Sequence, residues 1–163
     1  MNNYYAGVGS RQTPSDMLET MKLISQYLEQ KNYILRSGGA SGADKAFEAG
    51  VFNNKEIFYA NDANRDAERI AALYHPAWDR CSSYAKALHA RNAFQILGRD
   101  LKTPVEFVVC WTPDGAETHA QRKYETGGTG TAISIANKLG IRVYNLVNTQ
   151  SLTDFRTLVR TFR

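Results

Sequence analysis

Short apolar runs alternate with amphipathic segments along this chain. The strand-sized runs occupy residues 4–9, 33–39, 56–60, 106–111 and 142–147. Between them, apolar residues recur at three- and four-residue spacing, a pattern typical of amphipathic helices; the first such stripe is Met17, Met21, Ile24 and Leu28. The alternation predicts βαβ units with right-handed crossovers. We therefore expect an α/β fold, a Rossmann-like open parallel sheet of about five or more strands with helices on both faces.

Local signals set the expected boundaries within one domain that spans residues 1–163. Thr13 is expected to cap the first helix, with Pro14 at its first helical position. A helical insertion is expected at about 61–103, broken near 75–78 because a proline disfavours helix at the preceding residue. A C-terminal helix is expected at about 151–162.

The predicted helix over residues 83–98 carries two occupied faces. One is an apolar stripe formed by Ala87, Ala90, Phe94 and Leu97, and His89, Asn92 and Ile96 lie nearly opposite it. Such a helix is sandwiched either within its domain or against another subunit. We expect the second face to form a homodimer or a higher homo-oligomer.

Composition and charge limit the classes of partner. The chain has 163 residues and a formal net charge of +4, spread without a basic cluster, so nucleic-acid binding is not favoured. The longest apolar runs are far shorter than the roughly 20 residues of a membrane span. No signal peptide is recognisable and the two cysteines lie in unrelated contexts, so we expect a cytoplasmic protein without membrane contact.

Three glycine-rich turns follow predicted strands and lead into predicted helices. They read GVGSR (7–11), RSGGASGAD (36–44) and TGGTGT (126–131). Glycines let a ligand approach the backbone closely, and helix N-termini present free N–H groups that favour phosphate. Because such turns converge at the carboxyl edge of a parallel sheet, they predict a phosphate or nucleotide site there.

Familiar cofactor and metal patterns are not recognisable. Gln12 stands where a dinucleotide fingerprint has its third glycine, and residues 38–45 lack the spacing and ending of a P-loop. His75, His89 and His119 show no metal-ligand spacing with one another or with the cysteines. We therefore expect neither a metal nor a resident cofactor.

Several polar residues allow two interpretations each. Arg11 suits a bidentate phosphate contact. Asp44 either caps a helix or bonds a ribose hydroxyl. Arg36, inside a strand, is either an ion-pair partner or a pocket residue. Trp111 either stacks on a base or lies in the core.

The polar loop over residues 112–125 is longer than most connections between strand and helix, so we expect either a lid or a disordered loop. Its Arg122 and Lys123 would close over phosphate.

The motifs GVGSR, LRSGGASGAD, HARNAFQILG (89–98), GGTGTAISIA (127–136) and GIRVYNL (140–146) resemble the SLOG superfamily, in order over about residues 4–147. This superfamily includes the DprA/Smf proteins, the LOG phosphoribohydrolases and nucleotide-sensing domains. The chain is most similar to small stand-alone members common in phages and prophages. The resemblance implies a nucleotide-derived ligand, of ADP-ribose type or a cyclic nucleotide, and a homo-oligomer.

The resemblance and the glycine turns together give the expected ligand-binding residues. They are Gly9, Ser10, Arg11, Ser37, Gly38, Gly39, Gly42, Asp44, Arg91, Asn92, Trp111, Thr112, Gly127, Gly128, Thr129, Gly130 and Thr131.

One departure from the family pattern bears on catalysis. LOG enzymes place a catalytic Glu three residues after the final Thr of their GGTGT-like motif, and Ser134 stands there in this chain. We therefore expect a protein that binds its ligand without cleaving it, with sequestration of a defence signal as one use. The alternatives are a LOG-like N-glycosidase that uses Glu48, Asp44 or Glu125, and single-stranded DNA binding as in DprA.

Overall fold

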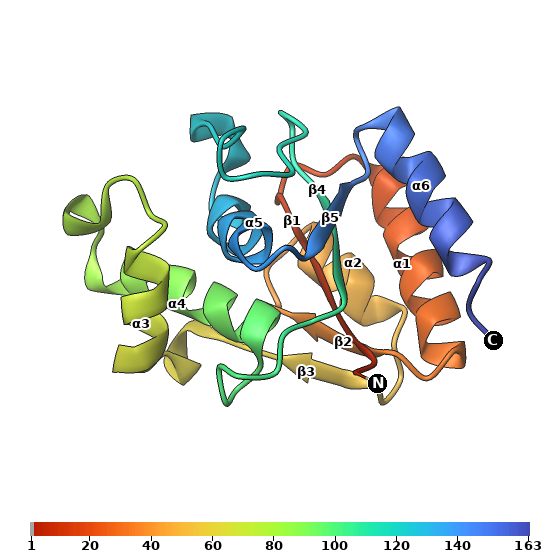
Figure 1. The fold of residues 1–163 in the computed structure, drawn as a ribbon, viewed down its shortest axis with the longest axis horizontal. Helices are drawn as coiled ribbons and strands as arrows, with labels where there is room; N and C mark the ends of the chain where they lie inside the picture. The colour runs from red at the N-terminus through yellow and green to blue at the C-terminus, as the bar shows by residue number, and fades with distance from the viewer. Residues whose placement is uncertain (1) are drawn as a thin grey trace.

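The predicted strands form a single five-stranded, all-parallel sheet in the computed structural model, which describes residues 2–163 (Figure 1). The strand order is β3-β2-β1-β4-β5. The strands are β1 (Tyr4–Gly9), β2 (Ile34–Ser37), β3 (Lys55–Ile57), β4 (Phe107–Trp111) and β5 (Arg142–Asn145). In the central ladder Tyr5 is paired with Leu35 of β2 and with Phe107 of β4. The predicted α/β class and parallel sheet are confirmed.

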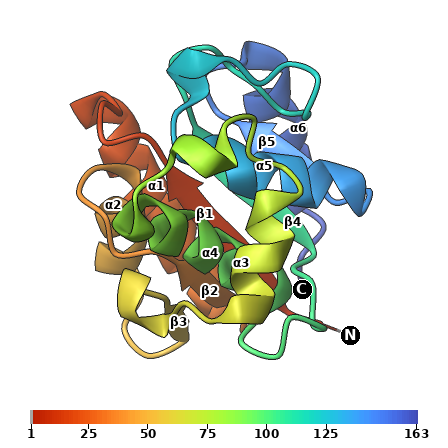
Figure 2. The ribbon, with the colours of Figure 1, turned by 90° about the vertical axis from the view of Figure 1, so that its left-hand side faces the viewer.

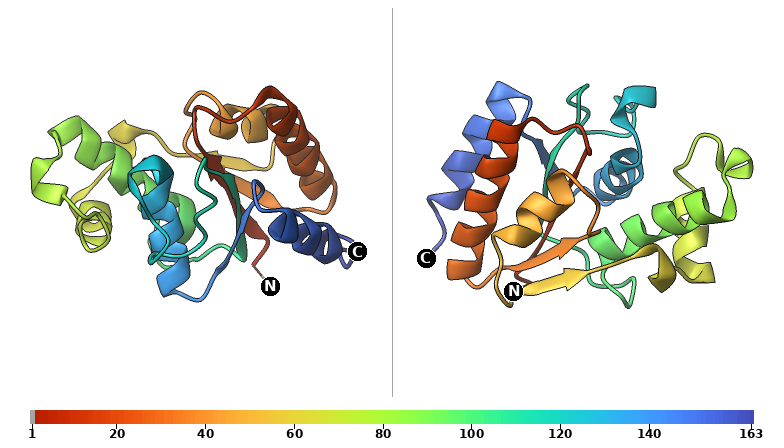
Figure 3. Two further views of the ribbon diagram at one scale, coloured as in Figure 1. Left: turned by 90° about the horizontal axis from the view of Figure 1, so that it is seen from above. Right: turned by 180° about the vertical axis from the view of Figure 1, so that it is seen from behind.

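Helices cover both faces of this sheet, as the views from above and behind show (Figure 3). One face packs against α1 (Ser15–Gln30), α2 (Ala43–Ala49) and α6 (Thr149–Val159), and the other against α3 (Arg65–Ala72), α4 (Ser83–Leu97) and α5 (Thr129–Lys138). Successive strand residues point to opposite faces: Tyr5 is buried against the first set of helices and Ala6 against the second. Strands β1, β4 and β5 therefore contribute to two separate apolar cores, whereas β2 and β3 contribute to the first alone.

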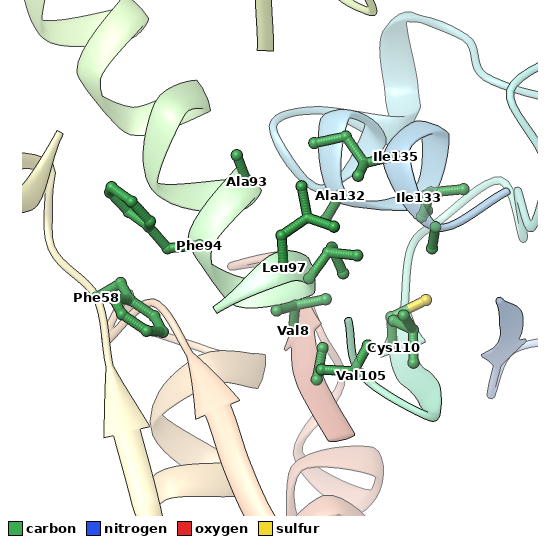
Figure 4. Packing of buried hydrophobic residues seen from close by; sticks show 14 of the residues in the cluster. Val8, Phe58, Ala93, Phe94, Leu97, Val105, Cys110, Ala132, Ile133 and Ile135 are labelled. Carbon is green, nitrogen blue, oxygen red and sulfur yellow. The ribbon is translucent and has the colours of Figure 1, made fainter. Parts of the chain in front are cut away.

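The core on the α3–α5 side is built mainly from aliphatic side chains of β1, β4, α4 and α5 (Figure 4). Phe58 and Phe94 stack at its edge with ring centroids 5.5 Å apart. The opposite core is more aromatic: Phe107 lies at its centre, within 5.9 Å of the rings of Tyr5 and Phe155. These two packed layers hold the carboxyl ends of the strands in place.

The predicted start of the first helix is wrong by one residue. Thr13 does not cap α1; its hydroxyl donates to the Ser10 carbonyl, and Pro14 occupies the cap position with extended backbone and no side-chain capping bond. Thr13 therefore stabilises the loop after β1 instead of capping the helix. The C-terminal helix likewise begins at Thr149 and ends at Val159, rather than spanning 151–162.

The predicted helical insertion is confirmed as two helices, α3 and α4, separated by a segment that includes a short 3₁₀ turn at 78–80. The two helices pack side by side at one end of the molecule (Figure 2). The second face of α4 is covered by the same chain: Asn92 and Ile96 are buried, and Ile96 belongs to the core shared with α5. The prediction that this face is free for a subunit contact is therefore wrong.

Arg36 is an ion-pair residue and not a pocket residue. Its guanidinium donates to Glu56 on β3 at 2.9 Å and to the carbonyl oxygen of Thr103. It also lies over the ring of Tyr4, 3.8 Å from the centroid. These contacts compensate the burial of a charge in the sheet.

None of the helices in residues 2–163 is long and apolar enough to cross a membrane.

Candidate functional site

A large cavity lies where the strand order reverses. From β1 the chain crosses to β2 on one side, whereas β4 pairs with the other side of β1. The cavity occupies about 680 Å³ beyond the carboxyl ends of these strands. Its walls come from the loop after β1, the turn before α2, the middle of α4 and the turn before α5. This position is the one expected for a ligand in an open parallel sheet, and the volume suits a nucleotide-sized molecule.

The structure brings nine of the seventeen predicted residues together around this cavity. They are Gly9, Ser10, Arg11, Asp44, Arg91, Asn92, Gly127, Gly128 and Thr129. The other eight lie elsewhere: Ser37, Gly38, Gly39, Gly42, Trp111, Thr112, Gly130 and Thr131 do not line it. The reason why a residue lines the cavity or does not differs among the three glycine-rich turns and the end of β4.

The turn before α5 presents bare backbone to the cavity. A Cβ added at Gly127 or Gly128 would meet nothing within 4 Å, so both glycines border open space. Among residues 2–163 no hydrogen bond accounts for the N–H groups of Gly128 and Thr129 at the start of the helix. These groups, with the positive end of the helix dipole, suit an anionic oxygen.

The second half of the same motif serves the protein itself. Gly130 packs closely against the Arg122 side chain. Thr131 is fully buried and its hydroxyl lies 2.9 Å from Nδ1 of His89 and 3.0 Å from a guanidinium nitrogen of Arg122. The expectation that the Thr131 hydroxyl reaches the ligand is therefore wrong.

The turn between β2 and α2 is used for packing. Ser37 is buried and donates to the Gly7 carbonyl at 2.6 Å. Gly39 lies against the Tyr59 ring, and Gly42, with φ +87°, backs onto the chain at Arg11. A side chain at Gly42 would collide with that loop, so the glycine is needed to bring two turns together.

The end of β4 is also structural. Thr112 is fully buried, and its hydroxyl bonds to Asp114 and to the amide of Asn145. Trp111 packs against the core on the α1–α2 face. Of the two interpretations of Trp111, burial against the core is correct.

Asp44, Arg91 and Gln95 form the cavity floor around Gly38. Arg91 donates from Nη1 to the Gly38 carbonyl at 2.9 Å, and Asp44 accepts from the Ala40 N–H at 3.3 Å. Burial raises the pKa of Asp44 to about 6, against the opposing effect of the Arg91 charge and of backbone N–H groups. Gly38 has no room for a side chain because these three groups press against it.

Two polar atoms of this floor have no hydrogen-bond partner among residues 2–163. They are Nε of Arg91 and Oε1 of Gln95, both buried. Buried polar atoms are usually hydrogen-bonded, so this pair points to a bound molecule or to water. Sequence reasoning missed Gln95, although it lies four residues after Arg91 on the same helical face.

The cavity rim adds charge and an aromatic ring. Arg11 is exposed beside Ser10, and Glu125 and Tyr124 stand on the opposite loop. The Tyr124 side chain contacts almost nothing, since the residue is 97% exposed. Its ring is free to stack on a planar group.

Ser134, where the LOG pattern has its catalytic carboxylate, lies outside the cavity. It is fully buried, and its hydroxyl bonds to Nδ1 of His119 at 2.7 Å. Arg122 reaches the same hydroxyl at 3.4 Å and donates to the carbonyl oxygen of Tyr74. The predicted closure of Arg122 over phosphate is wrong, because these contacts hold it away from the cavity.

The spacing of the histidines in the sequence suggested that they are independent of one another, and this is wrong for two of them. The fold brings His75, Cys81 and His89 together, with one potential ligand atom of each within 4.8 Å of the others. His89 also lines the cavity.

Comparison of this chain with protein-family models, with curated proteins and with solved structures found no match.

Proposed function

We propose that this protein binds a nucleotide-derived molecule in the cavity beyond β1 and β4, and holds it without cleaving it. The observation that carries the proposal is the convergence of free N–H groups at the start of α5 with two arginines at one cavity. The resemblance of the glycine turns to the SLOG superfamily supports the same class of ligand.

The charges at the cavity favour a phosphodiester or diphosphate over a terminal phosphate. Arg11 and Arg91 supply two positive charges, and Asp44 and Glu125 oppose them. Each phosphate group of a phosphodiester or of the ADP-ribose diphosphate carries one negative charge, so it meets less repulsion from these carboxylates than a terminal phosphate, which carries two on one group. ADP-ribose-type and cyclic nucleotides, which carry only diester or diphosphate groups, fit this balance.

The remaining groups suit a nucleoside. The unpartnered amide oxygen of Gln95 and Nε of Arg91 offer an acceptor and a donor at the floor. Tyr124 offers a ring at the rim for a base. Under this proposal the pocket sequesters a nucleotide signal, because the proposal assigns it no catalytic step.

Calorimetric titration with AMP, ADP-ribose, NAD and cyclic ADP-ribose isomers tests the proposal. We expect tight binding of at least one diester or diphosphate compound, and weaker binding of AMP. Charge reversal by Arg11→Glu or Arg91→Glu should abolish this binding. Arg99→Glu is the matched control, because Arg99 lies outside the cavity. Unchanged affinity in both cavity variants would show that the site is misplaced.

The rival function is a nucleotide N-glycosidase. Of its three candidate carboxylates, Asp44 and Glu125 line the cavity, whereas Glu48 forms ion pairs with Lys45 and Lys55. The raised pKa of Asp44 favours this alternative, since a carboxyl that titrates near neutrality suits general acid catalysis. Chromatography of the incubated nucleotides separates the two functions: free base that disappears in Asp44→Asn or Glu125→Gln would support the enzyme.

A further inference from the structure

His75, Cys81 and His89 come from three neighbouring segments of the chain and converge beside the cavity, where His89 forms part of the lining. His75 follows α3, Cys81 follows the 3₁₀ turn at 78–80, and His89 lies in α4. The Cys81 sulfur is 3.7 Å from Nε2 of His75, and the rings of His75 and His89 have centroids 4.3 Å apart. All three side chains are only partly exposed.

We propose that these three side chains form a binding site for a transition-metal ion, with Zn²⁺ as the ion that fits best. In a tetrahedral zinc site with usual bond lengths, a sulfur and a nitrogen ligand are about 3.6 Å apart. The observed separation of Cys81 Sγ and His75 Nε2 is close to that value. One thiolate and two imidazoles select zinc over magnesium or calcium, which prefer oxygen ligands.

One ring nitrogen of His89 already has a protein partner. Its Nδ1 lies 2.9 Å from the Thr131 hydroxyl, which leaves Nε2 for the ion. A partner on the second ring nitrogen is the usual way in which proteins fix the orientation of a ligating histidine. In this proposal the buried Thr131 hydroxyl orients a metal ligand, which is a different role from the expected contact with the nucleotide.

Coordination requires one local rearrangement. Nδ1 of His75 now accepts the N–H of Ala77 at 3.0 Å, so in the neutral ring Nε2 carries the proton. Binding through Nε2 moves this proton to Nδ1 and turns the Ala77 peptide away, while the Cys81 thiol releases its proton to solvent. The exchange gives up one backbone hydrogen bond and forms three metal bonds.

The surrounding charges are those of Arg122 and Arg91. Burial and the charge of Arg122 lower the pKa of both histidines. The same arginine charges oppose a cation, and the Cys81 thiolate offsets them on coordination. Three protein ligands leave the fourth position open for water or for an oxygen of a molecule in the cavity, which His89 lines.

Titration of metal-free protein with Zn²⁺ by calorimetry, in competition with a chelator, tests this site. We expect one ion per chain, and a loss of affinity of at least about tenfold in each of His75→Gln, Cys81→Ser and His89→Gln. His119→Gln is the matched control and should bind zinc as the wild type does. This experiment does not depend on the proposed nucleotide ligand.

Titration with Co²⁺ identifies the sulfur ligand directly. The wild-type protein should show a thiolate-to-cobalt charge-transfer absorption that Cys81→Ser abolishes. The second cysteine, Cys110, is fully buried and cannot replace it. Circular dichroism shows whether each variant is folded. Wild-type protein that binds no zinc, or folded Cys81→Ser and His89→Gln variants that bind it unchanged, would overturn the proposal.

Discussion

The pH dependence of the protein's free energy of unfolding tests whether the Asp44 carboxyl in the cavity floor has a raised pKa. Burial raises the pKa of its carboxyl to about 6 from an ordinary 3.8. In the unfolded chain the group titrates near the ordinary value, so between these values the folded state binds more protons than the unfolded state. The stability that protonated Asp44 contributes is therefore fully present below about pH 4, and it is lost as the pH rises through about 6.

The Asp44→Asn variant isolates this contribution because every other titrating group is common to both proteins. The difference between a pKa of 3.8 and one of about 6 corresponds to about 3 kcal/mol. We expect the free energy of unfolding of Asp44→Asn, minus that of the wild type, to increase by about this amount between pH 4 and pH 7.5.

Urea denaturation at a series of pH values, followed by circular dichroism, measures this difference. The absolute stability of the variant at any one pH does not matter, since Asn also changes the contacts with Arg91 and with the Ala40 N–H. A difference that stays constant with pH would refute the raised pKa. A difference that falls as the pH rises would mean that the carboxylate is stabilised in the folded protein, and the account of the floor would be wrong.

Further predictions concern the ion pair, the covered helix face and proton-linked binding. Arg36→Met should lower the free energy of unfolding by about 2–4 kcal/mol, because Glu56 and a carbonyl lose a partner, while calorimetry should show unchanged ligand affinity. Ile96→Ala should cost about 3 kcal/mol in urea denaturation, since the side chain is fully buried, and light scattering should show an unchanged mass; a lower mass with unchanged stability would instead indicate a subunit contact. An anionic ligand beside Asp44 should raise its pKa further, so affinity measured by calorimetry should increase as the pH falls from about 8 to about 6.

The sheet could be predicted from the sequence because its determinants are local. Most strands lie within short, largely apolar runs, and the parallel arrangement follows from the helices between the runs. Helix starts were less predictable: Thr13 has the right chemistry for a cap, but a tertiary contact with the Ser10 loop competes for its hydroxyl. A homo-oligomer stays a prediction, and the face chosen for it was wrong because periodicity does not reveal that α3 and α5 cover α4.

The sequence predicts where the backbone is exposed to a ligand, but it does not predict which residues of each turn face the cavity. The GGTGT stretch signals close approach, yet the sequence does not show that Gly127 and Gly128 face the cavity while Gly130 and Thr131 face Arg122. The cluster of histidines and cysteine had no signal in spacing, since α3 and α4 must fold together before His75 meets His89.

The central claim is that a nucleotide-derived molecule occupies the cavity, and mass spectrometry of captured ligand tests it most directly. Purified protein is incubated with a bacterial small-molecule extract, desalted and denatured, and the released compounds are identified beside those from an Arg11→Glu, Arg91→Glu double variant. The account predicts an intact phosphodiester- or diphosphate-containing nucleotide from the wild type and none from the variant. Release of no such compound from the wild type, or of equal amounts from both proteins, would contradict it.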